Sequence, residues 1–125
     1  MTLRAIVAAA AAIALTPAAA EGKRFRTYVA CGVADSTFAP PPSHSCPVGD
    51  LPHAVLIDRE RSNTQYKLCV TVPSGPRYCR RHQAGKRGKR SQRGLYNDSL
   101  GRHTVSWYHG GRLLKNWTLV RTIGD

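Results

Sequence analysis

A run of basic residues is the segment of this sequence best suited to binding chemistry. Residues 79–94, CRRHQAGKRGKRSQRG, contain seven lysines and arginines and no aspartate or glutamate. Arginine can donate two parallel hydrogen bonds to a phosphate, sulfate or carboxylate, and the interspersed glycines let the backbone follow such a chain. We therefore predict that this segment binds anions, through Arg80, Arg81, Lys86, Arg87, Lys89, Arg90 and Arg93.

Two other interpretations of the run are open at this stage. Runs of like charge often serve only solubility, so residues 80–93 could be a solvated loop with no ligand. The dibasic pairs at 86–87 and 89–90 also suit proteolytic processing. The run lacks bulky apolar residues, so we expect it to project as a mobile loop whether it binds anions, is only solvated or is cleaved by a protease.

The overall charge indicates which partners to expect. The chain has 19 lysines and arginines against 7 aspartates and glutamates, a net charge of +12. This excess favours anionic polysaccharides, wall polymers and lipid surfaces. Nucleic acid is expected only as a non-specific partner, because the run contains no aromatic residue on which bases would stack.

Little in the sequence suggests catalysis, a metal or a cofactor. Glu60 is the one candidate for a general base, and no nucleophile-elbow motif accompanies it. His103 and His109 are six positions apart, which on a strand is too far to chelate one ion. We therefore predict a non-enzymatic protein with no catalytic residues, no metal and no cofactor.

The N-terminus has the features of an export signal. Arg4 precedes an apolar stretch at 5–15, and small residues at 18–20 form a cleavage site. The stretch is shorter than a transmembrane helix, which needs about 20 apolar residues. We expect a cleaved signal peptide at 1–20 and a single secreted or periplasmic domain at 21–125, with no transmembrane anchor after cleavage.

The cysteines are expected to form two disulfides. Four cysteines in an oxidising compartment allow three pairings. The segment 66–79 is typical of a hairpin centred on Ser74, which would place Cys69 opposite Cys79. We therefore favour Cys69–Cys79, which leaves Cys31–Cys46 to close the proline-rich loop at 34–52.

The elements that position these residues are predicted to be strands. Residues 25–31, 53–58 and 66–72 are rich in β-branched and aromatic side chains, and no window shows a helical apolar stripe. A last hairpin spans 101–123. A three-residue turn at 110–112 gathers its apolar residues on one face, so we prefer it to a two-residue turn. The predicted core residues there are Val105, Trp107, Trp117 and Leu119, with Tyr108 on the opposite, exposed side.

These patterns favour an all-β fold, a small antiparallel β-sandwich with two disulfides. The segments 52–58, 66–79 and 101–120 carry a resemblance to the small immunoglobulin-like domains of exported bacterial proteins. The last segment is the most specific, with a tryptophan strand, a glycine turn and a second tryptophan strand. The resemblance covers about residues 50–123 and implies an immunoglobulin-like β-sandwich.

We accordingly predict a secreted binding module whose basic loop contacts anionic polymers or the cell-envelope surface. One alternative is a structural extracellular domain without a specific ligand. Another is a secreted protease inhibitor, because the export signal and the Cys31 to Cys46 spacing are similar to those of the subtilisin inhibitors of soil actinobacteria. Those inhibitors hold a long exposed loop with their second disulfide, whereas Cys69 and Cys79 enclose only nine residues.

Overall fold

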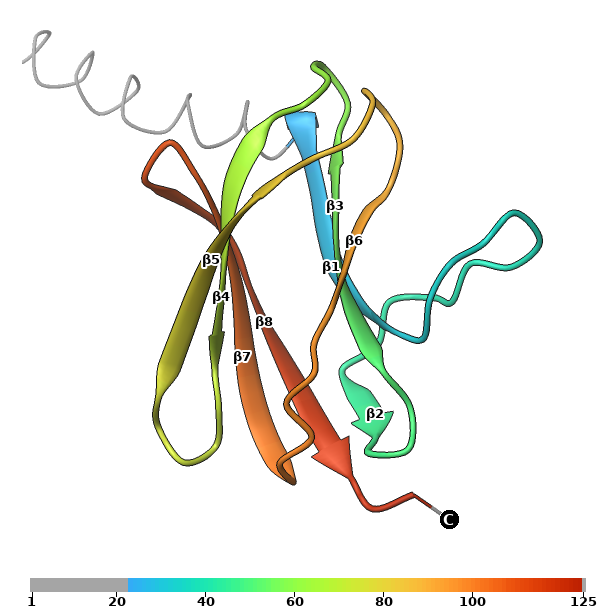
Figure 1. Ribbon diagram of the computed structural model, residues 1–125, viewed down its shortest axis with the longest axis vertical. Helices are drawn as coiled ribbons and strands as arrows, with labels where there is room; N and C mark the ends of the chain where they lie inside the picture. The colour runs from blue at the N-terminus through green and yellow to red at the C-terminus, as the bar shows by residue number, and fades with distance from the viewer. Residues whose placement is uncertain (1–22, 125) are drawn as a thin grey trace, which may run out of the picture.

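Alternating apolar and polar residues form strands over most of the chain, as predicted. The computed structural model describes residues 23–124, so the predicted signal peptide lies outside the described residues. The described residues form eight strands (Figure 1): β1 Phe25–Cys31, β2 Ser45–Pro47, β3 Pro52–Asp58, β4 Gln65–Thr71, β5 Arg77–Gln83, β6 Ser91–Gly94, β7 Gly101–His109 and β8 Arg112–Thr122. In this part of the chain, no helix is long and apolar enough to cross a membrane.

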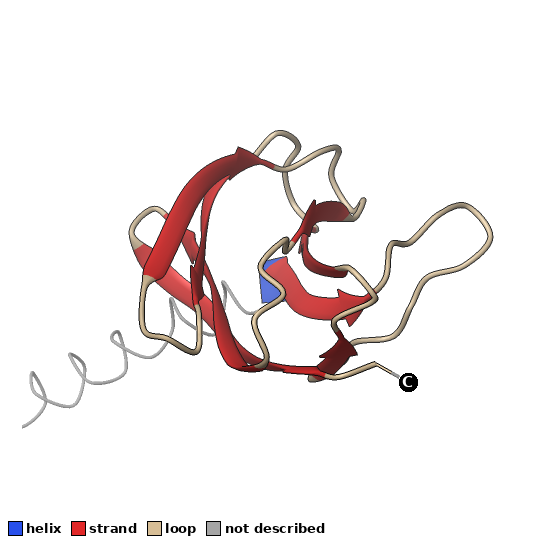
Figure 2. Cartoon of the chain, turned by 60° about the horizontal axis from the view of Figure 1, so that its bottom comes forward, coloured by secondary structure: helices blue, strands red, loops and turns tan. Residues whose placement is uncertain are grey.

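The strands form two sheets that face one another. One sheet has the order β1-β3-β6, and the other has the order β2-β8-β7-β4-β5. Figure 2 shows the two sheets curving around a shared interior. β4, β7 and β8 place buried side chains in this interior, whereas β5 has no buried residue. The predicted all-β fold is confirmed.

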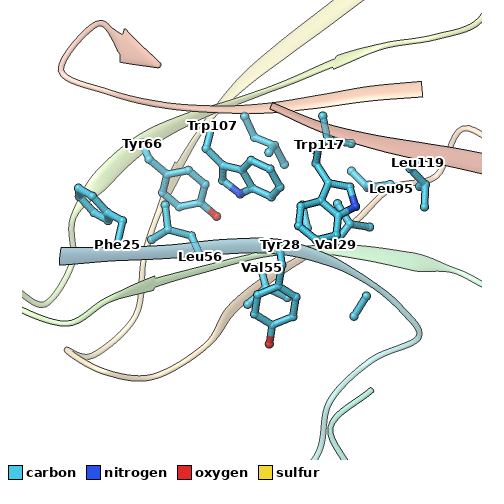
Figure 3. Packing of buried hydrophobic residues seen from close by; sticks show 14 of the residues in the cluster. Phe25, Tyr28, Val29, Val55, Leu56, Tyr66, Leu95, Trp107, Trp117 and Leu119 are labelled. Carbon is cyan, nitrogen blue, oxygen red and sulfur yellow. The ribbon is translucent and has the colours of Figure 1, made fainter. Parts of the chain in front are cut away.

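Apolar side chains from both sheets meet in the interior (Figure 3). Val105 and Trp107 are 0% exposed, Leu119 is 1% exposed and Trp117 is 9% exposed. Leu56 of the three-stranded sheet is also 0% exposed. Complete burial of a side chain the size of leucine contributes about 1.5–3 kcal/mol. The predicted apolar face of the last hairpin is therefore the core face.

Both predicted disulfides are present. Cys31 is bonded to Cys46, and Cys69 is bonded to Cys79. Cys69 and Cys79 are direct partners in the β4–β5 ladder, with their Cα atoms 4.0 Å apart. The predicted hairpin register centred on Ser74 is confirmed with them.

The turn of the β7–β8 hairpin differs from the prediction, although its core register is correct. Val105 pairs with Trp117 as expected, but His109 pairs with Arg112, so the turn has two residues rather than three. Both turn glycines have positive φ, 56° and 78°, which suits the type I′ turn that fits twisted strands. A bulge after Trp107 absorbs the extra residue instead.

The proline-rich loop at 34–52 also departs from the prediction, because it contains the short strand β2. This strand pairs in parallel with β8, so the larger sheet is mixed and not wholly antiparallel. Hydrogen bonds from Val120 N to His44 O and from Val48 N to Thr122 O hold it there. Cys46 is 0% exposed, and its disulfide with Cys31 holds the loop close enough to β8 for the two backbones to pair.

Candidate anion-binding surface

The predicted anion-binding run is divided among three places in the fold. Arg80 and Arg81 belong to β5, Arg93 belongs to β6, and the other four cations lie in the connection at 84–90. The prediction of a single projecting loop at 80–93 is therefore wrong. The hairpin continues to the end of β5 because its backbone ladder needs no apolar side chains, and an edge strand tolerates charge on both faces.

The connection at 84–90 is held against the turn between β3 and β4. Asn63 N donates to Gly85 O at 3.0 Å, and Gly88 N donates to Asp58 O at 2.7 Å. These bonds anchor the backbone from two sides, while the cationic side chains remain exposed. The charges of the connection are thus presented from an ordered backbone.

Asp58 organises this end of the fold. It is 2% exposed and accepts hydrogen bonds from Arg24 Nε at 3.0 Å and Arg24 Nη2 at 2.9 Å. The Thr64 hydroxyl and the amides of Glu60 and Arg61 donate to the same carboxylate. Burial alone would raise the pKa of Asp58, but the hydrogen bonds outweigh it and hold the pKa well below its usual range. Its charge therefore fixes the turn on which the basic connection rests.

Asp58 was not among the predicted site residues. The sequence signal for it is an aspartate at the end of a strand and before a polar turn, where its side chain can accept turn amides. That signal indicates a local turn. It does not indicate the ion pair with Arg24, which is 34 positions away in the chain.

Strand alternation sends Arg80 and Arg81 to opposite faces of the sheet. Arg80 is the ladder partner of the core residue Leu68, and Arg81 is the partner of the exposed Lys67. Arg80 therefore lies on the side that faces the other sheet, and Arg81 on the outer side. The two neighbouring arginines cannot bind one small anion together.

The fold brings Arg80 and Arg93 together although they come from different sheets. Both line the same cleft, together with His82. The pKa of His82 is lowered, mainly by burial and further by the charges of Arg93 and Arg80. These charges therefore act on one small volume between the sheets.

The outer face of the larger sheet carries cations that the sequence prediction missed. Lys67 Nζ lies 4.9 Å from the centre of the Tyr108 ring, and Arg77 Cζ lies 5.4 Å from it. Arg77 Nη2 also donates to Tyr108 Oη at 2.6 Å. Tyr108 is therefore half-buried, and not fully exposed as predicted, because cations cover its ring. Arg81 lies on the same outer face and extends this group.

We call the seven cations of the run the basic edge, because β5 and β6 are edge strands. All seven side chains are exposed. Within the described residues, none of them pairs with a carboxylate. An approaching anion therefore does not have to displace a carboxylate from these side chains.

Known proteins and metal chemistry give no separate indication of function. Among residues 23–124, no group of three or more His, Cys, Asp or Glu side chains could hold a metal ion. Comparisons with protein-family models, with curated proteins and with solved structures find no match to the chain.

Proposed function

We propose that this protein is an exported, non-enzymatic binding module that contacts anionic polymers of the cell envelope through the basic edge. One observation carries the proposal: seven exposed cations extend from two strands and an anchored connection, with no carboxylate partner among the described residues. An ordered backbone lowers the entropy lost on binding. Polysaccharides, wall polymers and anionic lipid surfaces all present the repeated anions that such an edge suits.

Export is supported by the cysteine chemistry. Both disulfides are formed and no free cysteine occurs in the described part of the chain. Disulfides persist in oxidising compartments and are rare in the cytosol. An extracellular or periplasmic location would also place the basic edge next to the proposed polymers.

We also propose that the two sheets form an immunoglobulin-like sandwich. The order β8-β7-β4-β5 corresponds to strands G, F, C and C′ of a variable-type domain, and β1-β3-β6 corresponds to strands A, B and E. Antibody domains join strands B and F by a disulfide, whereas the disulfides here close the β1–β2 loop and the β4–β5 hairpin. In this assignment the basic edge occupies strands C′ and E and their connection.

Salt-dependent binding to heparin tests the proposed function. Each anionic contact contributes about 0.7–0.9 to the slope of log affinity against log salt concentration. Replacing Arg87, Lys89 and Arg90 with serine should therefore lower the slope by about 2–3. The matched control replaces three exposed cations elsewhere in the fold, namely Arg26, Arg102 and Lys115.

The control triple should change the slope by less than half as much. Equal losses from both triples would show that charge acts diffusely, as in the structural domain without a specific ligand. Wild-type protein with no salt-sensitive affinity at about 50 mM salt, where ionic contacts are strongest, would refute the proposal.

A further inference from the structure

β5 and β6 diverge from the basic connection (Figure 1). Residues of both strands line a cleft. Its volume is about 810 Å³, within the range of roughly 300–1,000 Å³ that is typical of small-molecule sites. Leu68, Val70 and Val72 contribute apolar side chains from the β4 side. The cleft is therefore large enough for a ligand and has an apolar surface for it to cover.

Two tyrosines border the cleft. Tyr78 of β5 is 59% exposed, and Tyr96, shortly after β6, is 81% exposed. The Tyr96 ring lies against Gly94, where a Cβ atom would come 3.0 Å from the ring carbon Cζ. Aromatic rings next to apolar side chains form a surface of the kind that ligands cover.

The charges of the cleft are all positive. Arg80 and Arg93 line it, and its other polar side chains are hydroxyls, imidazoles and amides, with no carboxylate among its lining residues. Arg93 Nη2 donates to Gln83 O at 3.4 Å, which carries its guanidinium from β6 toward β5. Each guanidinium can donate two parallel hydrogen bonds to a carboxylate. A cationic ligand would be repelled, and a neutral one would leave both guanidinium groups unused.

We propose that this cleft binds a small organic acid, with its carboxylate at Arg80 and Arg93 and its apolar body against Leu68 and Val70. The site uses the inner face of β5, whereas the proposed polymer contact uses the exposed surface of the whole basic edge. A ligand of this kind would cover the apolar surface and supply the missing counter-charge at the same time. The proposal does not depend on polymer binding.

Isothermal titration with decanoate tests the site, with decanol and decyltrimethylammonium as neutral and cationic probes of equal chain length. Arg80→Gln should weaken decanoate binding about tenfold or more, as expected for loss of a charged hydrogen bond. Arg81→Gln is the matched control, because Arg81 is the next residue on the same strand and lies on the outer face. It should change decanoate affinity less than about twofold.

Several results would overturn the cleft site. These are absence of decanoate binding, equal affinity for decanol, or equal losses from Arg80→Gln and Arg81→Gln. Unchanged unfolding midpoints verify that the variants fold, and Tyr96→Ser provides a second variant that should weaken decanoate binding without removing charge.

Heparin binding separates the two proposals, because Arg80→Gln and Arg81→Gln should weaken heparin binding equally. Conversely, replacement of Arg87, Lys89 and Arg90 should leave decanoate binding intact.

Discussion

Replacing Asp58 with asparagine should destabilise the whole domain, because this buried carboxylate joins three segments of the chain. Arg24, Thr64 and two amides of the β3–β4 turn all donate to it. Asparagine keeps the size but loses the charge, and its NH₂ group would face donors instead of acceptors. Removing one partner of a buried ion pair costs about 3–5 kcal/mol. That is a large part of the roughly 5–15 kcal/mol that stabilises a typical domain.

Urea denaturation measures this loss directly, and thermal unfolding should show a midpoint lower by more than about 12 °C. The matched control is Asp98→Asn, because Asp98 is exposed. It should change the free energy of unfolding by less than about 0.5 kcal/mol. Amide exchange at Gly88 should also accelerate in Asp58→Asn, because Gly88 N donates to the main-chain O of Asp58, and the carboxylate contacts hold this part of the backbone in place.

The effect of Asp58 should depend on pH in a defined direction. Its pKa in the folded protein lies below the usual value of 3.8. The unfolded chain therefore binds the proton more tightly, so the stabilisation is complete above about pH 5 and is lost as the pH falls. The stability difference between wild type and Asp58→Asn should shrink toward about pH 2. A difference that stays constant, or one below about 1 kcal/mol at neutral pH, would refute the reasoning.

Three further predictions follow from single side chains. Trp107→Ala should cost about 3–5 kcal/mol in urea denaturation, against about 1 kcal/mol for Tyr108→Ala; equal small costs would contradict the burial of Trp107. Gly111→Ala should cost about 1–2 kcal/mol because of its positive φ, whereas Gly49→Ala should be nearly neutral, and equal effects would argue against the two-residue turn. Burial, above all, lowers the pKa of His103, so stability should decrease as the pH falls below about 6.5. His103→Gln should make the free energy of unfolding, measured by urea denaturation, less dependent on pH in this range. A pH dependence equal to that of the wild type would contradict the idea that His103 causes the decrease.

The sequence by itself determined the features that depend on near neighbours. Within 66–79, the bend residues and the strand alternation place Cys69 opposite Cys79, because a short turn sets every pair of a hairpin ladder. The core face with Val105 and Trp117 follows from the same rule. The form of the turn does not, because an extra residue at the turn or in a bulge gives the same pairing beyond it.

The tertiary structure decided the features that depend on distant segments. Strand β2 forms because β8 and a disulfide lie beside it, and its own three residues have no strand pattern. The ion pair joins Asp58, at the end of β3, to Arg24, the residue before β1, and the pairing of these two strands is set by burial of their apolar faces. Neither feature has a local signal.

The basic edge shows both kinds of information in one segment. Composition alone indicated that Arg80, Arg81 and Arg93 are exposed cations without a carboxylate nearby in the run, because charge and the absence of bulky apolar residues are properties of the segment itself. Which of them share a site was decided by the fold. Pairing with β4 turns Arg80 inward and Arg81 outward, and the divergence of the two sheets places Arg93 across the cleft from Arg80. That shared position depends on how two separate sheets pack, and no pattern within residues 79–94 specifies that packing.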